Sequence, residues 1–380
     1  MLVTQRKEKS GQMPWEFFPS VPLSRKVAGF RFKNPAGMTN RGFLTFSWLQ
    51  GVPKVHEVLL RKDLAGAARR LAHLRVFSWF RVSHRGMRDC GERISIMKLS
   101  FSTNAFVRFS VPEAVEIIAK TGYAGVEILA DVPHLYPFST TGQGLAEIAS
   151  CLEKNRIRAA NINANTALGY YGAKFWEPLF EPSLANPEAD ARKWRVEYTK
   201  KCIDMARLFS CRNVSVTSGR MVPGTRPERS LALLKESLLD VVEYAAAKNV
   251  RVGMEYEPGL LVERVEELAS LIREIGADNF GANLDFGHSH VAGEDPHYVA
   301  RMLGSGIFHV HVEDICKRKH YHLIPGQGEI DFTEIFRALD GIGYDEFVTV
   351  ELYTFPEIPR EAAEEAFNYL ENIFSNGTVK

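Results

Sequence analysis

From residue 97 onward, short apolar runs alternate with longer amphipathic stretches. The runs have the length of buried strands, and the stretches repeat their apolar residues at the helical period. The pattern predicts eight strands, at 97–103, 124–129, 157–163, 212–217, 250–255, 279–285, 306–312 and 346–351. It predicts helices near 111–121, 142–155, 188–209, 227–248, 262–275, 295–304, 331–341 and 359–375. Eight strand–helix units of this size are typical of one α/β fold, the (β/α)8 or TIM barrel.

A doubly wound open sheet is the alternative arrangement of such units. It would usually carry a glycine-rich phosphate-binding turn after its first strand. The stretch "STNAFVRFS", which follows that strand here, has no such turn. The barrel is therefore the expected fold.

Residues 1–96 lack this rhythm and differ in charge from the rest of the chain. They contain 18 Lys+Arg against 6 Asp+Glu, whereas the whole chain has a formal net charge of +1. A segment without an apolar period rarely builds a core. We therefore expect a poorly structured basic N-terminal extension over 1–96, dispensable for folding, and a catalytic barrel over 97–380. The alternative is an accessory segment that binds a partner.

Composition narrows the class of protein further. The near-neutral net charge gives no reason to expect nucleic acid or an anionic membrane as a partner. The five cysteines are scattered and never spaced as CxxC, which argues against a disulfide framework and favours a reducing cytoplasm. We find no apolar run of about 18 residues and no secretory signal pattern, so a cytoplasmic protein without a membrane partner is expected.

Polar side chains gather at the predicted carboxyl ends of the strands, the face where TIM barrels build their sites. They are Asn104, Glu127, Asn161, Asn163, Glu255, Glu257, Asp285, His288, His309, His311 and Glu351. A single acidic residue at a strand end is usually a solvated rim residue. Four consecutive strands, however, offer one ligand each: Glu255, Asp285, His311 and Glu351. Three carboxylates and one imidazole suit one divalent ion, namely Mn²⁺, Mg²⁺, Co²⁺ or Zn²⁺.

The residues alone leave two questions about this set open: which glutamate is the ligand, and what the two histidines of one strand do. Glu257 shares the direction of Glu255 along its strand and competes with it as the ligand. His309 and His311 alternate with valines, so both face the same side of the strand. Such a pair is either a hydrogen-bonded core pair or part of a site.

Five motifs, in this order, resemble a known family: "VGMEYEPG", "NLDFGHSH", "HVHVED", "HLIPGQGEIDF" and "VTVELY". Together they are similar to the xylose-isomerase-like TIM-barrel superfamily of sugar isomerases, ketose 3-epimerases and, more distantly, endonuclease IV. The resemblance covers residues 97–375. It implies that Glu255, Asp285, His311 and Glu351 bind the metal ion, with Glu255 preferred over Glu257 because "EYEP" matches the family's Glu-x-x-Pro.

The resemblance also implies roles in catalysis and substrate binding. Glu255 and Glu351 would be the acid/base pair, acting on a carbon next to a metal-polarised carbonyl. His288 would contact substrate, with Glu257, His322 and Asn163 as further substrate-binding residues. Lys317 lies where the family often has a basic residue that contacts substrate, although a solvated basic turn is an equal interpretation.

Endonuclease IV provides a contrast, because it holds three zinc ions with additional histidines after strands 3 and 4. Here those strands end in "NINAN" and "VTSG", without histidine. This argues against a DNA-repair site. His320 and His322 do occupy the place of additional ligands, so a second ion stays open.

The segment 164–187 is long for a connection between strand and helix. Its aromatic residues, among them Trp176, would form a lid over the substrate or mediate contacts in a homo-oligomer. The sequence thus predicts a metal-dependent isomerase or epimerase of a sugar or sugar-like polyol. Alternatives are a lyase or dehydratase on an oxo-sugar or cyclitol, a sugar-binding barrel without activity, and an enzyme like endonuclease IV.

Overall fold

The computed structural model describes residues 97–172 and 179–375. The expected extension at 1–96 and the residue Trp176 therefore lie outside the described residues. The described residues all belong to one compact unit, Asp89–Lys380.

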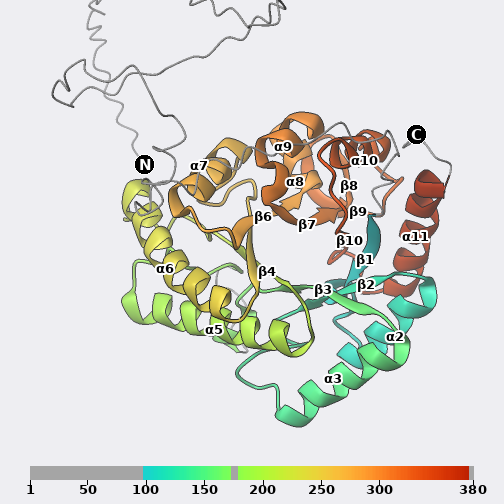
Figure 1. The fold of residues 1–380 in the computed structure, drawn as a ribbon, viewed down its shortest axis with the longest axis horizontal. Helices are drawn as coiled ribbons and strands as arrows, with labels where there is room; N and C mark the ends of the chain where they lie inside the picture. The colour runs from blue at the N-terminus through green and yellow to red at the C-terminus, as the bar shows by residue number, and fades with distance from the viewer. Residues whose placement is uncertain (1–96, 173–178, 376–380) are drawn as a thin grey trace, which may run out of the picture. The chain divides into compact units, whose positions relative to one another are not determined.

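Eight parallel strands close into a barrel in the order β1-β10-β7-β6-β5-β4-β3-β2 (Figure 1). Their bounds are β1 Lys98–Ser102, β2 Gly125–Leu129, β3 Arg158–Asn163, β4 Asn213–Thr217, β5 Arg251–Glu255, β6 Phe280–Asp285, β7 Ile307–Val312 and β10 Phe347–Val350. The first strand pairs with the last, Lys98 opposite Phe347 and Phe101 opposite Val350. The TIM-barrel prediction is confirmed.

Helices follow the strands and surround the barrel (Figure 1). They are α2 Val111–Thr121, α3 Gly142–Asn155, α5 Ala189–Leu208, α6 Pro227–Ala247, α7 Val265–Ile275, α9 Pro296–Leu303, α10 Phe332–Gly341 and α11 Pro359–Ser375. Side-chain caps set several starts. Ser110 and Glu113 form a reciprocal capping box on α2, and Asp331 accepts the amides of Thr333 and Glu334 in the first turn of α10. None of the described helices is long and apolar enough to cross a bilayer.

Three shorter elements were not predicted and stand at the carboxyl ends of the strands. They are α4 Leu168–Tyr171, α8 Phe286–Ala292 and the antiparallel hairpin of β8 Asp314–Cys316 with β9 Lys319–Leu323. His290 thus lies in a helix, α8, in a stretch where the pattern predicts none. The physical reason is that Asp285, the last residue of β6, caps α8 by accepting the amide of His288 at 2.8 Å.

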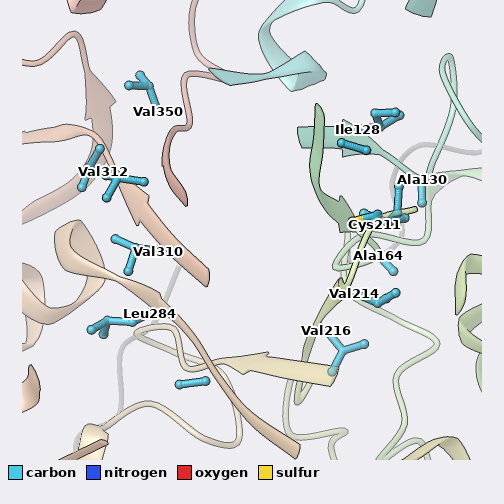
Figure 2. Packing of buried hydrophobic residues seen from close by; sticks show 14 of the residues in the cluster. Ile128, Ala130, Ala164, Cys211, Val214, Val216, Leu284, Val310, Val312 and Val350 are labelled. Carbon is cyan, nitrogen blue, oxygen red and sulfur yellow. The ribbon is translucent and has the colours of Figure 1, made fainter. Parts of the chain in front are cut away.

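Apolar and polar side chains alternate along the barrel strands and point to opposite faces of the barrel wall. Figure 2 shows apolar side chains such as Val214, Val216, Val310 and Val312, which belong to the hydrophobic core that includes the helices. Residues between them along the strands are polar and buried, for example Ser215 and His311. Because neighbouring side chains of a strand point to opposite faces, the core lies outside the barrel wall and the polar residues face its interior.

Candidate metal centre

The barrel interior contains a polar network that joins opposite walls. Asn161 Nδ2 of β3 donates to Glu127 Oε2 of β2 at 2.8 Å, and His311 Nε2 of β7 reaches the same oxygen at 2.6 Å. Asn165, just beyond β3, donates to Glu255 Oε2 of β5 at 2.8 Å. These contacts bring residues far apart in sequence to one buried place.

The four residues predicted as ligands lie together there. Glu255, Asp285, His311 and Glu351 each offer one ligand atom, and these atoms all lie within 4.8 Å of one another. His311 Nδ1 is 3.5 Å from Glu255 Oε2, 4.0 Å from Asp285 Oδ2 and 3.7 Å from Glu351 Oε2. All four residues are buried, so water does not screen their charges.

Hydrogen bonding supports the fit of a cation. Asp285 Oδ1 accepts the amide of His288, but buried Asp285 Oδ2 has no hydrogen-bond partner among the described residues. An unpartnered buried carboxylate oxygen is costly unless a cation or proton faces it. Three carboxylates and one imidazole nitrogen are a donor set suited to a divalent ion.

The electrostatics of the group follow from burial and crowding. Burial raises the pKa of Glu351 well above its usual range, and the Glu255 and Asp285 carboxylates push in the same direction. Burial also raises the pKa of Asp285. The attraction of its carboxylate to His288, His322 and His311 is stronger than this effect and lowers the pKa to about 2. A bound cation would relieve the repulsion among these carboxylates.

Amide groups fix both glutamates. Glu255 Oε2 accepts from Asn165 and from Asn283, the latter at 2.7 Å. Glu351 Oε1 accepts from Asn104 at 2.9 Å and from Asn163 at 3.1 Å. Each carboxylate thus has one oxygen held by two side-chain amides, which leaves its other oxygen for a different partner.

A second group of possible ligands, His288, His320 and His322, lies next to the first. His288 Nε2 and His322 Nε2 are 3.0 Å and 3.3 Å from His320 Nε2. The Nδ1 atoms of His288 and His322 lie 3.1 Å and 2.7 Å from the carbonyl oxygens of Tyr256 and Glu351. Burial lowers the pKa of His320 to about 4 and that of His322 to about 3, so both rings are neutral at pH 7. His288 and His322 thus turn Nδ1 to a backbone carbonyl and Nε2 toward His320, an orientation that metal-binding histidines also adopt.

Glu313 lies beside both groups and was not predicted. It is fully buried, and neither carboxylate oxygen has a hydrogen-bond partner among the described residues. Its Oε1 lies 3.9 Å from His322 Nε2, and a Cβ at Gly287 would come within 1.5 Å of that oxygen. Burial raises the pKa of Glu313 well above its usual range, with Asp285 adding to the effect. Glycine at 287 therefore makes the room that this carboxyl group occupies.

The other residues predicted to bind substrate lie in different surroundings. Glu257 is 9% exposed at the edge of the site, and burial raises its pKa to about 7. The amide nitrogen of Asn163 donates hydrogen bonds to Glu351 Oε1 and Glu127 Oε1. Lys317 is exposed in the β8–β9 turn, where it has a φ of 53°.

The segment predicted as a lid is anchored near its start. Asp131 accepts hydrogen bonds from the Thr166 hydroxyl at 2.6 Å and the Leu168 amide at 2.7 Å. The buried guanidinium of Arg195 donates to the carbonyls of Ala164, Asn165 and Thr166. These contacts hold Asn165 where its amide reaches Glu255.

Glu127 is the main residue that was noted at a strand end but given no role. It forms a third close group with His309 and His311. The signal was present, because Glu127 is the single charged residue in the apolar strand "GVEIL" and is 0% exposed. A buried charge in an apolar strand implies a partner, but only closure of the barrel shows that the partner is His311.

Comparisons with known proteins bear on the family and the fold. The model of the family described as xylose isomerase-like TIM barrel matches residues 115–373. Fructoselysine 3-epimerase from Shigella flexneri is 22% identical over 276 residues, which cover 71% of this chain and 95% of that protein.

Solved structures share the fold. A D-tagatose 3-epimerase-like protein superposes with a TM-score of 0.62 at 23% identity, over 74% of this chain and 99% of that one. The IOLI protein, whose crystal structure holds a zinc atom, has the same TM-score and the same coverage at 19% identity. At these identities the superpositions show the fold alone.

Proposed function

Because the chain belongs to the xylose isomerase-like TIM-barrel family, we propose that it is a metal-dependent isomerase or epimerase of a sugar or sugar-like polyol. The observation that carries the proposal is the buried group of Glu255, Asp285, His311 and Glu351, with one ligand atom from each within 4.8 Å. Two of its members are glutamates: Glu255 ends β5 and Glu351 follows β10, and β6 and β7 lie between these two strands. The names of the epimerase relatives support a ketose-like substrate.

The four side chains would hold one divalent ion, with Mn²⁺, Mg²⁺, Co²⁺ and Zn²⁺ as candidates. When bound, such an ion polarises a substrate carbonyl and so acidifies the hydrogen on the neighbouring carbon. The unpartnered Asp285 Oδ2 and the convergence of three carboxylates support this occupancy. The zinc atom in the similar barrel of the IOLI protein is consistent with it.

The glutamates would perform the proton transfers. One glutamate, as a carboxylate, takes the proton from the carbon next to the carbonyl. The other, as a carboxylic acid, gives its proton to the opposite face of that carbon, which inverts it. The amide pairs on Glu255 Oε2 and Glu351 Oε1 hold each carboxylate in a fixed orientation for this step. Such preorganisation lowers the entropic cost of bringing base and substrate together.

Residues around this centre would bind the substrate. His288, His322, Glu257 and Asn163 lie at or next to it, and polar groups of this kind suit hydroxyls of a polyol. Lys317 and Trp176 remain proposed contacts from the hairpin turn and from the segment 164–187. Alternatively, the three Nε2 atoms of His288, His320 and His322 would hold a second ion.

The proposal is tested by metal analysis of the purified protein and by deuterium exchange into ketoses, aldoses, inositols and their oxo derivatives. We expect the wild type to carry a divalent ion and to exchange the hydrogen next to the carbonyl of its substrate. With metal ion in large excess, Glu351→Gln should still bind the ion, more weakly, and lose the exchange, whereas Glu329→Gln, a matched change on an exposed residue, should keep both.

Three results would contradict parts of the proposal. Exchange that survives in Glu351→Gln would exclude this residue as an essential base. Sugar binding by metal-free protein without any turnover would favour a binding protein. Loss of water from an oxo-sugar would instead place the chain among the lyases.

A further inference from the structure

The two ring nitrogens of His311 face two different groups of charges. Nδ1 faces the candidate metal centre, with three carboxylate oxygens at 3.5–4.0 Å. Nε2 faces away from it, toward Glu127 Oε2 at 2.6 Å. His311 and Glu127 are both 0% exposed, so this contact is shielded from water.

The contact with Glu127 decides which nitrogen of His311 carries hydrogen. An ionised carboxylate only accepts hydrogen bonds, so His311 Nε2 is the donor. In the neutral ring, Nδ1 then carries the lone pair and points toward Glu255, Asp285 and Glu351. Asn283 Nδ2, an amide donor, lies 3.2 Å from Nδ1, which agrees with a lone pair on that nitrogen. A cation between Nδ1 and the three carboxylates would stabilise the lone pair and the carboxylates together.

Glu127 is itself held on all sides by donors. Asn161 Nδ2 donates to Oε2 at 2.8 Å, and Asn163 Nδ2 donates to Oε1 at 3.1 Å. His309 Nε2 lies 3.5 Å from Oε2 and is 2.9 Å from the hydroxyl of Thr349. These contacts leave the carboxylate little freedom to turn, so it holds the imidazole of His311 in one orientation.

We propose that Glu127 is a positioning residue of the metal centre, which fixes His311 as an Nδ1 ligand by accepting its Nε2–H. This inference rests on the proposed metal-dependent function. A carboxylate on the far nitrogen orients the ring and strengthens the near nitrogen as a ligand, and removing such a partner typically weakens metal affinity about 10- to 100-fold.

A competing interpretation places the ion between Glu127, His309 and His311, which also lie close enough to share one. The hydrogen bonds argue against it. Both Glu127 oxygens already accept from asparagine amides, and His311 Nε2 cannot donate to Glu127 and bind an ion at once. Asp285 Oδ2, which has no hydrogen-bond partner among the described residues, lies on the Nδ1 side instead, 4.0 Å from that nitrogen.

The test measures the dissociation constants of Mn²⁺ and Zn²⁺ for the full chain after chelator treatment, by competition with a metal indicator. We expect Glu127→Gln to weaken binding about 10- to 100-fold, because the amide keeps the shape but loses the charge. Glu127→Asp should lose less, since it keeps the charge. Ser100→Ala, which alters another buried polar side chain of the barrel, is the matched control and should bind as the wild type does.

A second readout reports on the ligand geometry rather than on affinity. The visible spectrum of the Co²⁺-loaded protein should shift in Glu127→Gln and stay unchanged in Ser100→Ala. Unfolding of the metal-free variants shows whether the fold survives; if Glu127→Gln does not fold, the comparison of Glu127→Asp with Ser100→Ala carries the test.

The outcomes separate this inference from the function on which it rests. A wild type that binds no ion contradicts the proposed function, and this inference fails with it. A wild type that binds an ion with the same affinity and Co²⁺ spectrum as Glu127→Gln contradicts the role of Glu127 alone. If the ion instead lies between Glu127, His309 and His311, His309→Ala and Glu127→Ala should weaken metal binding equally. That result would overturn the assignment of Nδ1 as the ligand atom.

Discussion

The amide nitrogen of Asn163 donates to Glu351 Oε1 at 3.1 Å, although 188 residues separate the two in sequence. The same nitrogen lies 3.1 Å from Glu127 Oε1. One buried amide therefore links the proposed base Glu351 to the carboxylate that orients His311.

Replacing Asn163 should show how much this bridge stabilises the barrel. Asn163→Ala removes a donor from two buried carboxylates, which should lower the free energy of unfolding by about 2–4 kcal/mol. Asn163→Asp should be worse, because it brings a third carboxylate to the same place. Urea unfolding of the metal-free protein measures both. An Asn163→Asp variant as stable as the wild type would mean that Asn163 acts there only by filling space.

Gly287 provides a test of the space occupied by Glu313. Gly287→Ala places a methyl group on Glu313 Oε1 and should destabilise the protein by about 1–3 kcal/mol. Glu313→Ala in the same chain should remove most of that cost, which a double-mutant cycle measures. Gly341→Ala, where a Cβ meets nothing within 4 Å, is the control. Additive effects of the two changes would contradict the predicted clash.

Metal binding should stabilise the fold through Asp285. At an ion concentration about 100 times the dissociation constant, binding adds about 2.7 kcal/mol, or roughly 5–10 °C in Tm for a domain of this size. Thermal unfolding with and without Mn²⁺ or Zn²⁺ measures the shift. Asp285→Asn should abolish it, whereas Asp278→Asn, a change at the surface, should leave it intact. A shift of the same size in both variants would place the ion elsewhere.

His134 should make the stability depend on pH. Burial lowers the pKa of this ring below its usual value of 6.5. Its Nε2 lies 3.0 Å from the carbonyl of Phe106, and its Nδ1 lies 3.1 Å from the Thr103 hydroxyl. As the pH falls below about 6.5, the unfolded chain takes up a proton that the folded ring resists, so its stabilisation is full above that pH and is lost below it.

The measurement compares wild type with His134→Gln by denaturant unfolding between pH 8 and pH 5. The wild type should lose more stability than the variant over this range. Parallel curves would show that protonation of His134 has no part in acid unfolding.

A chain that starts at Met97 should fold and keep its activity. The described strands close the barrel by themselves, with β1 paired to β10 on one side and β2 on the other. Cooperative unfolding and turnover equal to those of the full chain are the expected results. A truncated chain that folds but loses turnover would give residues 1–96 an accessory role.

The sequence by itself determined the eight strand–helix units, because apolar periodicity reports burial along each element. It also pointed to Glu255, Asp285, His311 and Glu351, since their position at the ends of consecutive strands is a local property of the chain. The helical start after Asp285 was missed, because it depends on a single side-chain cap that a glycine–histidine stretch does not reveal.

Only the tertiary structure decided which of these polar groups meet. Glu127 and His311 are 184 residues apart and come within 2.6 Å because the barrel closes. The same closure turns the amides of Asn104, Asn163, Asn165 and Asn283 onto the two glutamates, and brings His320 and His322 of the hairpin to His288. Periodicity gives the face on which a side chain lies, but its partner across the barrel is set by strand order and register, which no local pattern encodes.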